Sequence, residues 1–119
     1  RLILKNNKVG IMVEAIIETV VCSPAQGRDA RLLRMLNARQ EFKRQKSGCL
    51  AAWHAKSSNG DSLLLVQSVF ASRQDWIDIS NQIVETLDSR DGGLESCLLG
   101  PPLVGVFTVE TDDLQLNLG

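Results

Sequence analysis

The stretch from Leu98 to Val109, which reads LLGPPLVGVFTV, decides the fold more than any other part of the chain. A short apolar turn, a rigid proline pair and an alternating apolar run follow one another without a gap, and proline is tolerated where a strand begins. This order predicts the last strand of the fold over 104–110. The rest of the chain must supply the strands and helices that pack against it.

The first strand and the first helix are predicted in the N-terminal half. Residues 13–22 alternate between two sets of side chains, which indicates a strand. After a break at 23–27, apolar residues fall at helical intervals over 28–46. Gly48 suits a left-handed cap at the end of that helix. The predicted buried stripe of the helix consists of Leu32, Met35, Leu36 and Phe42.

A hairpin is predicted around Asn59 and Gly60, because this pair accepts the positive φ values of a type I′ turn. Its strands are expected over 49–56 and 62–70, paired antiparallel. The second strand is nearly all apolar, which is typical of a central strand that is buried on both faces.

A second helix is predicted from a cap at Ser72, with the acidic Asp75 at its third position, to about residue 89. A glycine loop and a short helix over 94–99 lead to the last strand. The resulting order, β-α-β-β-α-β, is the split βαβ arrangement of ferredoxin-like α+β folds with an antiparallel sheet. The stripe of the second helix is predicted to be Trp76, Ile79, Ile83 and Leu87.

The chain of 119 residues is predicted to form one α+β domain over 12–110, with an N-terminal extension over 1–11 and a tail over 111–119. Hydrophobic residues make up 44% of it and charged residues 23%, as in ordinary globular chains. No apolar run approaches the ~20 residues that cross a bilayer, so no membrane span is expected.

The cysteines predict a reducing compartment and no metal site. Cys22, Cys49 and Cys97 are odd in number and contain no CxxC pair, so we expect free thiols in a cytoplasmic protein. Together with His54 they show no recognised zinc spacing. The chain also has no GxGxxG, Walker or HExxH motif, and no cofactor is expected.

Charge is divided between the two halves of the chain. Residues 1–56 hold 11 Lys and Arg against 4 Asp and Glu, whereas residues 57–119 hold 2 against 10. We expect these charges to cancel when the halves, or two copies, pack together.

Nucleic-acid binding is the weaker alternative, because the chain has no stacking motif and only 4% aromatic residues. It would use Arg28, Arg31, Arg34, Arg39, Lys43, Arg44 and Lys46.

Four short patterns in order give the chain a resemblance to a known family. They are Ser23-Pro24 after the first strand, SGCL at 47–50, FASRQ at 70–74, and Gly100-Pro101-Pro102 before Val104, Val106 and Phe107. Over 12–110 the chain resembles the antibiotic biosynthesis monooxygenase family of dimeric α+β barrels. The resemblance implies a homodimer with a pocket in each subunit between sheet and helices. It also implies oxidation of polycyclic aromatics without metal or flavin, haem degradation, or processing of small signalling molecules.

The chain departs from that family where the chemistry would lie. Phe70 stands at the end of the third strand, where active relatives often have tryptophan, and the resemblance places Ile79 where a histidine is common. The asparagine that some members carry on the first strand corresponds to Glu18 or Thr19. These differences argue against haem degradation.

The leading hypothesis is a cofactor-independent monooxygenase acting on a small aromatic or lipophilic substrate. His54 is the candidate base, because its near-neutral pKa suits removal of a phenolic proton. Phe70 and Trp76 are the candidate walls of the substrate pocket. The alternative is a non-catalytic dimeric domain that binds a small molecule or regulates a partner, with His54 as a structural residue. Glu14 and Glu18 share one face of the first strand and are expected to be solvated or to lie between subunits.

Overall fold

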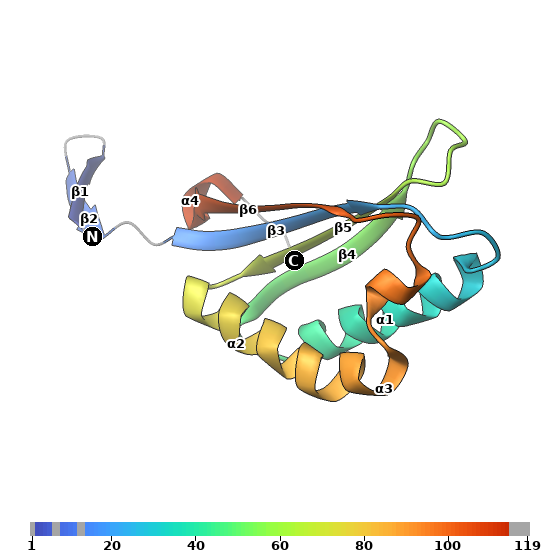
Figure 1. Ribbon diagram of the computed structural model, residues 1–119. Helices are drawn as coiled ribbons and strands as arrows, with labels where there is room; N and C mark the ends of the chain where they lie inside the picture. Colours follow the sequence, from blue (N-terminus) through green and yellow to red (C-terminus); the bar gives the residue numbers. More distant parts are fainter. Residues whose placement is uncertain (1, 6–7, 12–13, 115–119) are drawn as a thin grey trace.

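The computed structural model describes residues 2–5, 8–11 and 14–114 (Figure 1). The strands are β1 (Leu2–Lys5), β2 (Lys8–Ile11), β3 (Glu14–Cys22), β4 (Cys49–Lys56), β5 (Leu64–Phe70) and β6 (Leu103–Glu110). The helices are α1 (Asp29–Arg44), α2 (Arg73–Ile83), the π-helical η1 (Val84–Asp88), α3 (Ser89–Asp91), the 3₁₀-helical η2 (Leu94–Cys97) and α4 (Thr111–Leu114).

The predicted ferredoxin-like α+β fold is confirmed. Four antiparallel strands form one sheet in the order β4-β5-β3-β6, and the apolar β5 occupies an inner position as predicted. Figure 1 shows α1 and α2 packed on one side of this sheet, while the other side carries no helix over β4 and β5. Within the segment predicted as an extension, β1 and β2 pair with each other as a separate hairpin.

The loop of the hairpin between β4 and β5 covers 57–63, whereas the predicted strands over 49–56 and 62–70 leave 57–61 between them. The ladder ends at the pair Lys56 and Leu64, and the backbone N–H of Ser57 donates to Leu63 O at 2.9 Å. Gly60 has the expected positive φ of 80°. The type I′ turn predicted at Asn59 and Gly60 is not formed, and side chains accept backbone hydrogen bonds within the loop instead; Asp61 Oδ1, for example, accepts from Leu63 N at 3.1 Å.

Gly48 has a different role from the one predicted. Helix α1 is capped by Gln45 in a right-handed conformation, and Gly48 is not among the glycines with positive φ. A Cβ at Gly48 would instead lie within 2.8 Å of Asp75 Cβ, so glycine is needed for a close approach. The cap predicted for α2 is confirmed, since Ser72 Oγ accepts from Asp75 N at 3.1 Å.

The helix-covered face of the sheet carries two apolar clusters. One joins Leu32, Leu36 and Cys22, and the other joins Ile16, Phe70 and Ile79. Two cations on α1, Arg39 and Lys43, are also buried, at 5% and 8% exposed. Both belong to the cations that the nucleic-acid alternative would use, whereas in the structure both line the cavity described below.

The bare face of the sheet exposes large apolar side chains. Leu103 is 75% exposed and Phe107 is 58% exposed, both on the edge strand β6. Leu65 is half-buried on the same face. Val69 lies on this face too, but it is buried.

Candidate functional site

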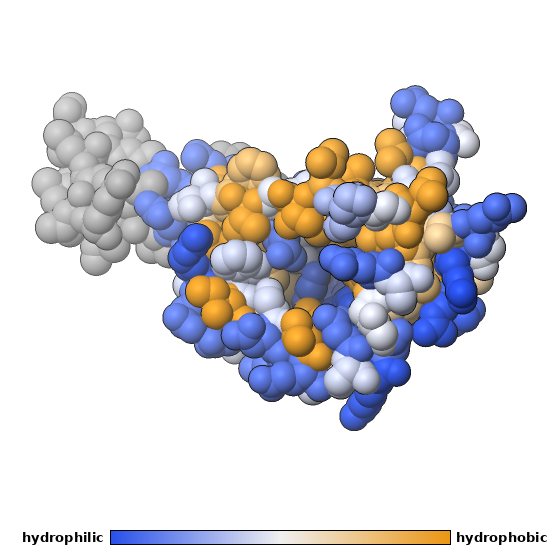
Figure 2. Space-filling view, in the orientation of Figure 1, coloured by the Kyte–Doolittle hydropathy of each residue, from blue (hydrophilic) through white to orange (hydrophobic). Residues whose placement is uncertain are grey.

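A cavity of about 530 Å³ separates the sheet from the helices. Its roof is the helix-covered face of the sheet, and its floor and walls come from α1, the α2–η1 junction and the segment 92–98. Figure 2 shows the hollow between the sheet layer and the helices, with apolar side chains gathered along the sheet. This size lies within the ~300–1,000 Å³ range of small-molecule sites.

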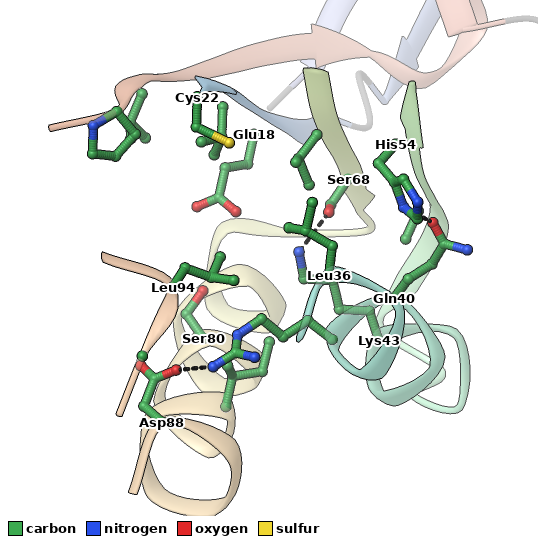
Figure 3. Close-up of a pocket in the computed structure, with 18 of the residues that line it drawn as sticks. Glu18, Cys22, Leu36, Gln40, Lys43, His54, Ser68, Ser80, Asp88 and Leu94 are labelled. Carbon is green, nitrogen blue, oxygen red and sulfur yellow. Dashed lines mark hydrogen bonds and ion pairs between the residues drawn. The ribbon is translucent and has the colours of Figure 1, made fainter. Parts of the chain in front are cut away.

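Most of the cavity wall is apolar. The side chains that provide it are Val20, Cys22, Leu36, Val66, Leu94 and Val104. A smaller set of polar groups converges on the same space, as expected for a site that orients a ligand. Four of these polar side chains are Glu18, Lys43, His54 and Ser68, which are labelled in Figure 3.

His54 lies on β4 at the cavity wall, and its ring is held by Gln40 of α1. The distance from His54 Nδ1 to Gln40 Oε1 is 2.9 Å. An amide oxygen only accepts hydrogen bonds, so this contact requires a proton on Nδ1, and a ring that carries a single proton then has its lone pair on Nε2. The arrangement fixes a tautomer in which Nε2 can accept a proton.

Lys43 reaches the roof of the cavity from α1. Its Nζ donates to Ser68 Oγ at 2.9 Å, and both side chains are buried. Burial lowers the pKa of Lys43, and the negative charge of Glu18 acts in the opposite direction. Ser68 takes one of three N–H donors on the ammonium group.

Glu18 lies beside Ser68, on the neighbouring strand and the same sheet face. Trp76 Nε1 donates to Glu18 Oε2 at 2.9 Å, which fixes the carboxylate from the side of α2. Of the two positions expected for Glu18, the solvated one is wrong, because the side chain lines the cavity; a position between subunits stays a prediction. Glu14, at the start of β3, is exposed.

Arg39 ties α1 to the end of the second helical segment. Its Nη1 and Nη2 donate to the carboxylate of Asp91 at 2.9 and 3.0 Å, and Nη2 also donates to Asp88 Oδ1. The hydrogen bonds from Arg39 lower the pKa of Asp91. These pairs join the basic half of the chain to the acidic half, which is the internal cancellation that the charge division predicts.

The structure brings only one of the three predicted site residues to the cavity wall. His54 lines the cavity, whereas Phe70 is fully buried in the core and is not among the lining residues. Trp76 does not line it either, and contributes by holding Glu18. Trp53 precedes His54 on β4, so its side chain belongs to the opposite face of the sheet, but the residue still contributes atoms to the cavity boundary.

Two cavity residues, Arg39 and Lys43, could have been found from spacing. They continue the apolar stripe of α1 at intervals of three and four residues after Leu32 and Leu36, which places them on the buried face. A cation on such a face points to a partner or a site. The sequence singles out Ser68 less clearly, because it is one of two polar residues, with Gln67, in a strand that is otherwise apolar.

Several residues of the proposed nucleic-acid surface are engaged elsewhere. Arg39 and Lys43 are buried, and Arg44 donates to the backbone oxygen of Ala52 at 2.8 and 3.0 Å. Arg31 donates to the backbone oxygen of Asp91. The basic residues of α1 therefore do not form one free surface.

Within the described ranges, no cluster of three or more His, Cys, Asp or Glu side chains is placed to bind a metal ion. Cys22, Cys49 and Cys97 are free thiols. No helix of residues 14–114 has the length and apolar character needed to span a membrane.

Solved structures share this fold at low sequence identity. Rv0793 of Mycobacterium tuberculosis is 19% identical with a TM-score of 0.69, and the match covers 78% of this chain and 92% of that one. "Putative antibiotic biosynthesis monooxygenase" from Nitrosomonas europaea is 10% identical with a TM-score of 0.67, covering 82% and 92%. A protein of the same description from Deinococcus radiodurans is 13% identical with a TM-score of 0.64, covering 77% and 89%.

These likenesses confirm the predicted resemblance at the level of the fold. No protein-family model matches the chain, and no curated protein matches it. Function must therefore be argued from the site itself.

Proposed function

We propose that this chain is a cofactor-independent oxygenase that binds a small aromatic substrate in the cavity beneath the sheet. The apolar wall would hold the rings, and the polar groups would act on a single acidic position. Supporting this, the structures that share the fold include proteins named as antibiotic biosynthesis monooxygenases. The free thiols agree with action in the cytoplasm.

The chemistry requires the substrate to be its own reductant. An anthrone-type methylene loses one proton to His54 Nε2, and the resulting carbanion transfers its electrons to O₂ as a C–O bond forms. The peroxide takes the proton back from His54. Loss of the second C–H proton then breaks the O–O bond, so that CH₂ and O₂ become C=O and water.

This proposal depends most on the position of the His54 imidazole, which a hydrogen bond to Gln40 fixes at the cavity wall. Its Nδ1 is bound to Gln40 Oε1, which leaves Nε2 as the group that accepts a proton. A positioned base contributes about 10²- to 10⁴-fold to the rate of a proton transfer. A ligand packed against the apolar wall would displace water that could quench the carbanion.

Oxygen uptake with 1,8-dihydroxyanthrone tests the proposal. The wild-type chain should consume one O₂ per substrate and form the quinone faster than buffer does, and His54→Ala should lower that rate by roughly 100-fold or more. Gln40→Leu should lower it by less, since the base remains but its tautomer is no longer fixed. Unchanged uptake in His54→Ala would remove His54 from the mechanism.

We also propose that two copies pair through the bare face of the sheet. The exposed Leu103 and Phe107 provide an apolar surface that the helices do not cover. Light scattering should therefore give twice the mass of a single chain at micromolar concentration. A single-chain mass would contradict the pairing.

The second candidate is a non-catalytic dimeric domain that binds a small molecule. Ile79 favours it, because the position where the resemblance suggests a histidine is buried among Ile16 and Phe70 and offers no reactive group. Such a domain would bind aromatic ligands in the same cavity without consuming oxygen. The oxygen-uptake measurement separates the two candidates.

A further inference from the structure

Lys43 is a buried cation with an incomplete set of partners. Within residues 14–114, its Nζ bonds only to the neutral Ser68 Oγ, and no carboxylate of this range forms an ion pair with it at 4.0 Å or less. The residue is 8% exposed and lines the cavity. A buried charge is costly unless it is paired, so an ammonium group in this position is suited to an acceptor that arrives with the ligand.

The charged side chains next to Lys43 already have hydrogen-bond partners within the protein. Arg39 is bound by Asp88 and Asp91, and one oxygen of Glu18 accepts from the indole of Trp76. Lys43 therefore differs from Arg39, the other basic residue deep in this cavity, in lacking an acidic partner. The remaining N–H donors of Nζ are available to a ligand oxygen.

Glu18 limits which ligand oxygens can occupy that position. Glu18 and Ser68 are Cα partners on adjacent strands, so the carboxylate lies on the same face as the Lys43 contact. The charged groups that act on Lys43 are Glu18 of β3 and Arg39 of α1. A permanent anion entering here is attracted by Lys43 and repelled by Glu18.

A weak acid avoids this conflict. A phenol or an enol enters uncharged, and when it loses its proton to His54 the total charge of the cavity does not change. The new negative oxygen then lies against an ammonium group in a poorly hydrated space, where a charge-assisted hydrogen bond is strong.

We propose that Lys43 and Ser68 form the subsite that binds the charged oxygen of a phenolic or enolic ligand, and that Glu18 makes this subsite selective for weak acids over carboxylates. The inference rests on the proposed function in taking the cavity as the ligand site and His54 as the proton acceptor. It adds an anchor and a selectivity residue that the oxygen chemistry alone does not require.

Binding of three matched probes tests the subsite without any oxidation. The probes are 4-nitrophenol, its methyl ether 4-nitroanisole, and 4-nitrobenzoate. The wild-type chain should bind 4-nitrophenol most tightly, and the visible phenolate band should appear at a pH where the free probe is mostly protonated. Lys43→Met should remove that band and weaken 4-nitrophenol binding roughly tenfold, while 4-nitroanisole binding stays the same.

Lys46→Met is the matched control, because Lys46 lies on the ring of Phe42 and does not line the cavity. It should bind all three probes as the wild type does. Ser68→Ala should reproduce part of the Lys43→Met effect. Circular dichroism establishes that each variant is folded before binding is compared.

Glu18→Gln tests the selectivity, since the amide oxygen can still accept from Trp76 Nε1. This variant should bind 4-nitrobenzoate roughly tenfold more tightly than the wild type does. Equal binding of 4-nitrophenol by Lys43→Met and wild type would overturn the anchor, and unchanged 4-nitrobenzoate binding by Glu18→Gln would overturn the selectivity. Oxygen uptake that persists in either case would leave the proposed function standing, and the expected probe pattern without oxygen uptake would leave the subsite standing.

Discussion

Replacing Arg39 with methionine should destabilise the fold by about 2 kcal/mol. Arg39 is 5% exposed and its guanidinium donates to Asp88, to Asp91 and to the backbone oxygen of Met35. Breaking a fully buried ion pair costs roughly 3–5 kcal/mol. The side chains of Asp88 and Asp91 are 34% and 25% exposed, so they regain water when the partner is lost, and the cost is smaller.

Thermal unfolding measures this change, with Arg34→Met as the matched control. Arg34 is exposed on the same helix, and its replacement should change the free energy of unfolding by no more than about 0.5 kcal/mol. For a chain of this size, 2 kcal/mol corresponds to a fall in Tm of roughly 8 °C. Equal melting temperatures for the two variants would refute the argument that Arg39 holds α1 to the η1–α3 segment.

The same pair predicts how stability depends on pH. Because Arg39 lowers the pKa of Asp91 in the folded state, the stabilisation is fully present above the ordinary pKa of an aspartate, about 3.9. It is lost as the pH falls through the lower, folded-state pKa. The difference between wild type and Arg39→Met should therefore narrow in acid, and a constant difference down to the acid transition would contradict the pairing.

Three further predictions concern single positions. Ser72→Ala should lower the free energy of unfolding by about 1 kcal/mol through loss of the helix cap, whereas the exposed Ser58→Ala should not change it measurably in a urea titration. Gly48→Ala should destabilise by about 1–3 kcal/mol in the same titration, because its Cβ would displace Asp75; an unchanged midpoint would show that the contact is easily relieved. Phe107→Lys should give a single-chain mass by light scattering, and a mass unchanged from a wild-type dimer would place the interface elsewhere.

The order of elements could be predicted because local signals agreed with it. The cap at Ser72, the prolines before β6 and the apolar run of β5 each act over a few residues, and the structure confirms each. The loop after β4 could not be predicted, because its length depends on where the ladder stops and not on the Asn-Gly pair alone. Gly48 was misassigned for a similar reason, since the contact with Asp75 joins segments 27 residues apart.

The site was harder to predict than the fold. His54 could be chosen as the single histidine, but its partner Gln40 lies on another element and carries no motif. The strand pattern alone gave Glu18 the character of a solvated residue. The hydrogen bond that fixes it in the cavity comes from Trp76, which is 58 residues away in the sequence. Lys43 was grouped with surface cations, although its spacing on α1 already placed it on the buried face.

The central claim is that the space between sheet and helices is where this chain binds an aromatic ligand. Mapping the backbone amide NMR shifts caused by 4-nitroanisole tests it most directly, because this probe needs neither ionisation nor oxygen. We predict saturable shifts centred on Val66, Leu94 and His54, which face the cavity. Shifts confined to Leu103 and Phe107 on the bare face, or none at all, would contradict the claim.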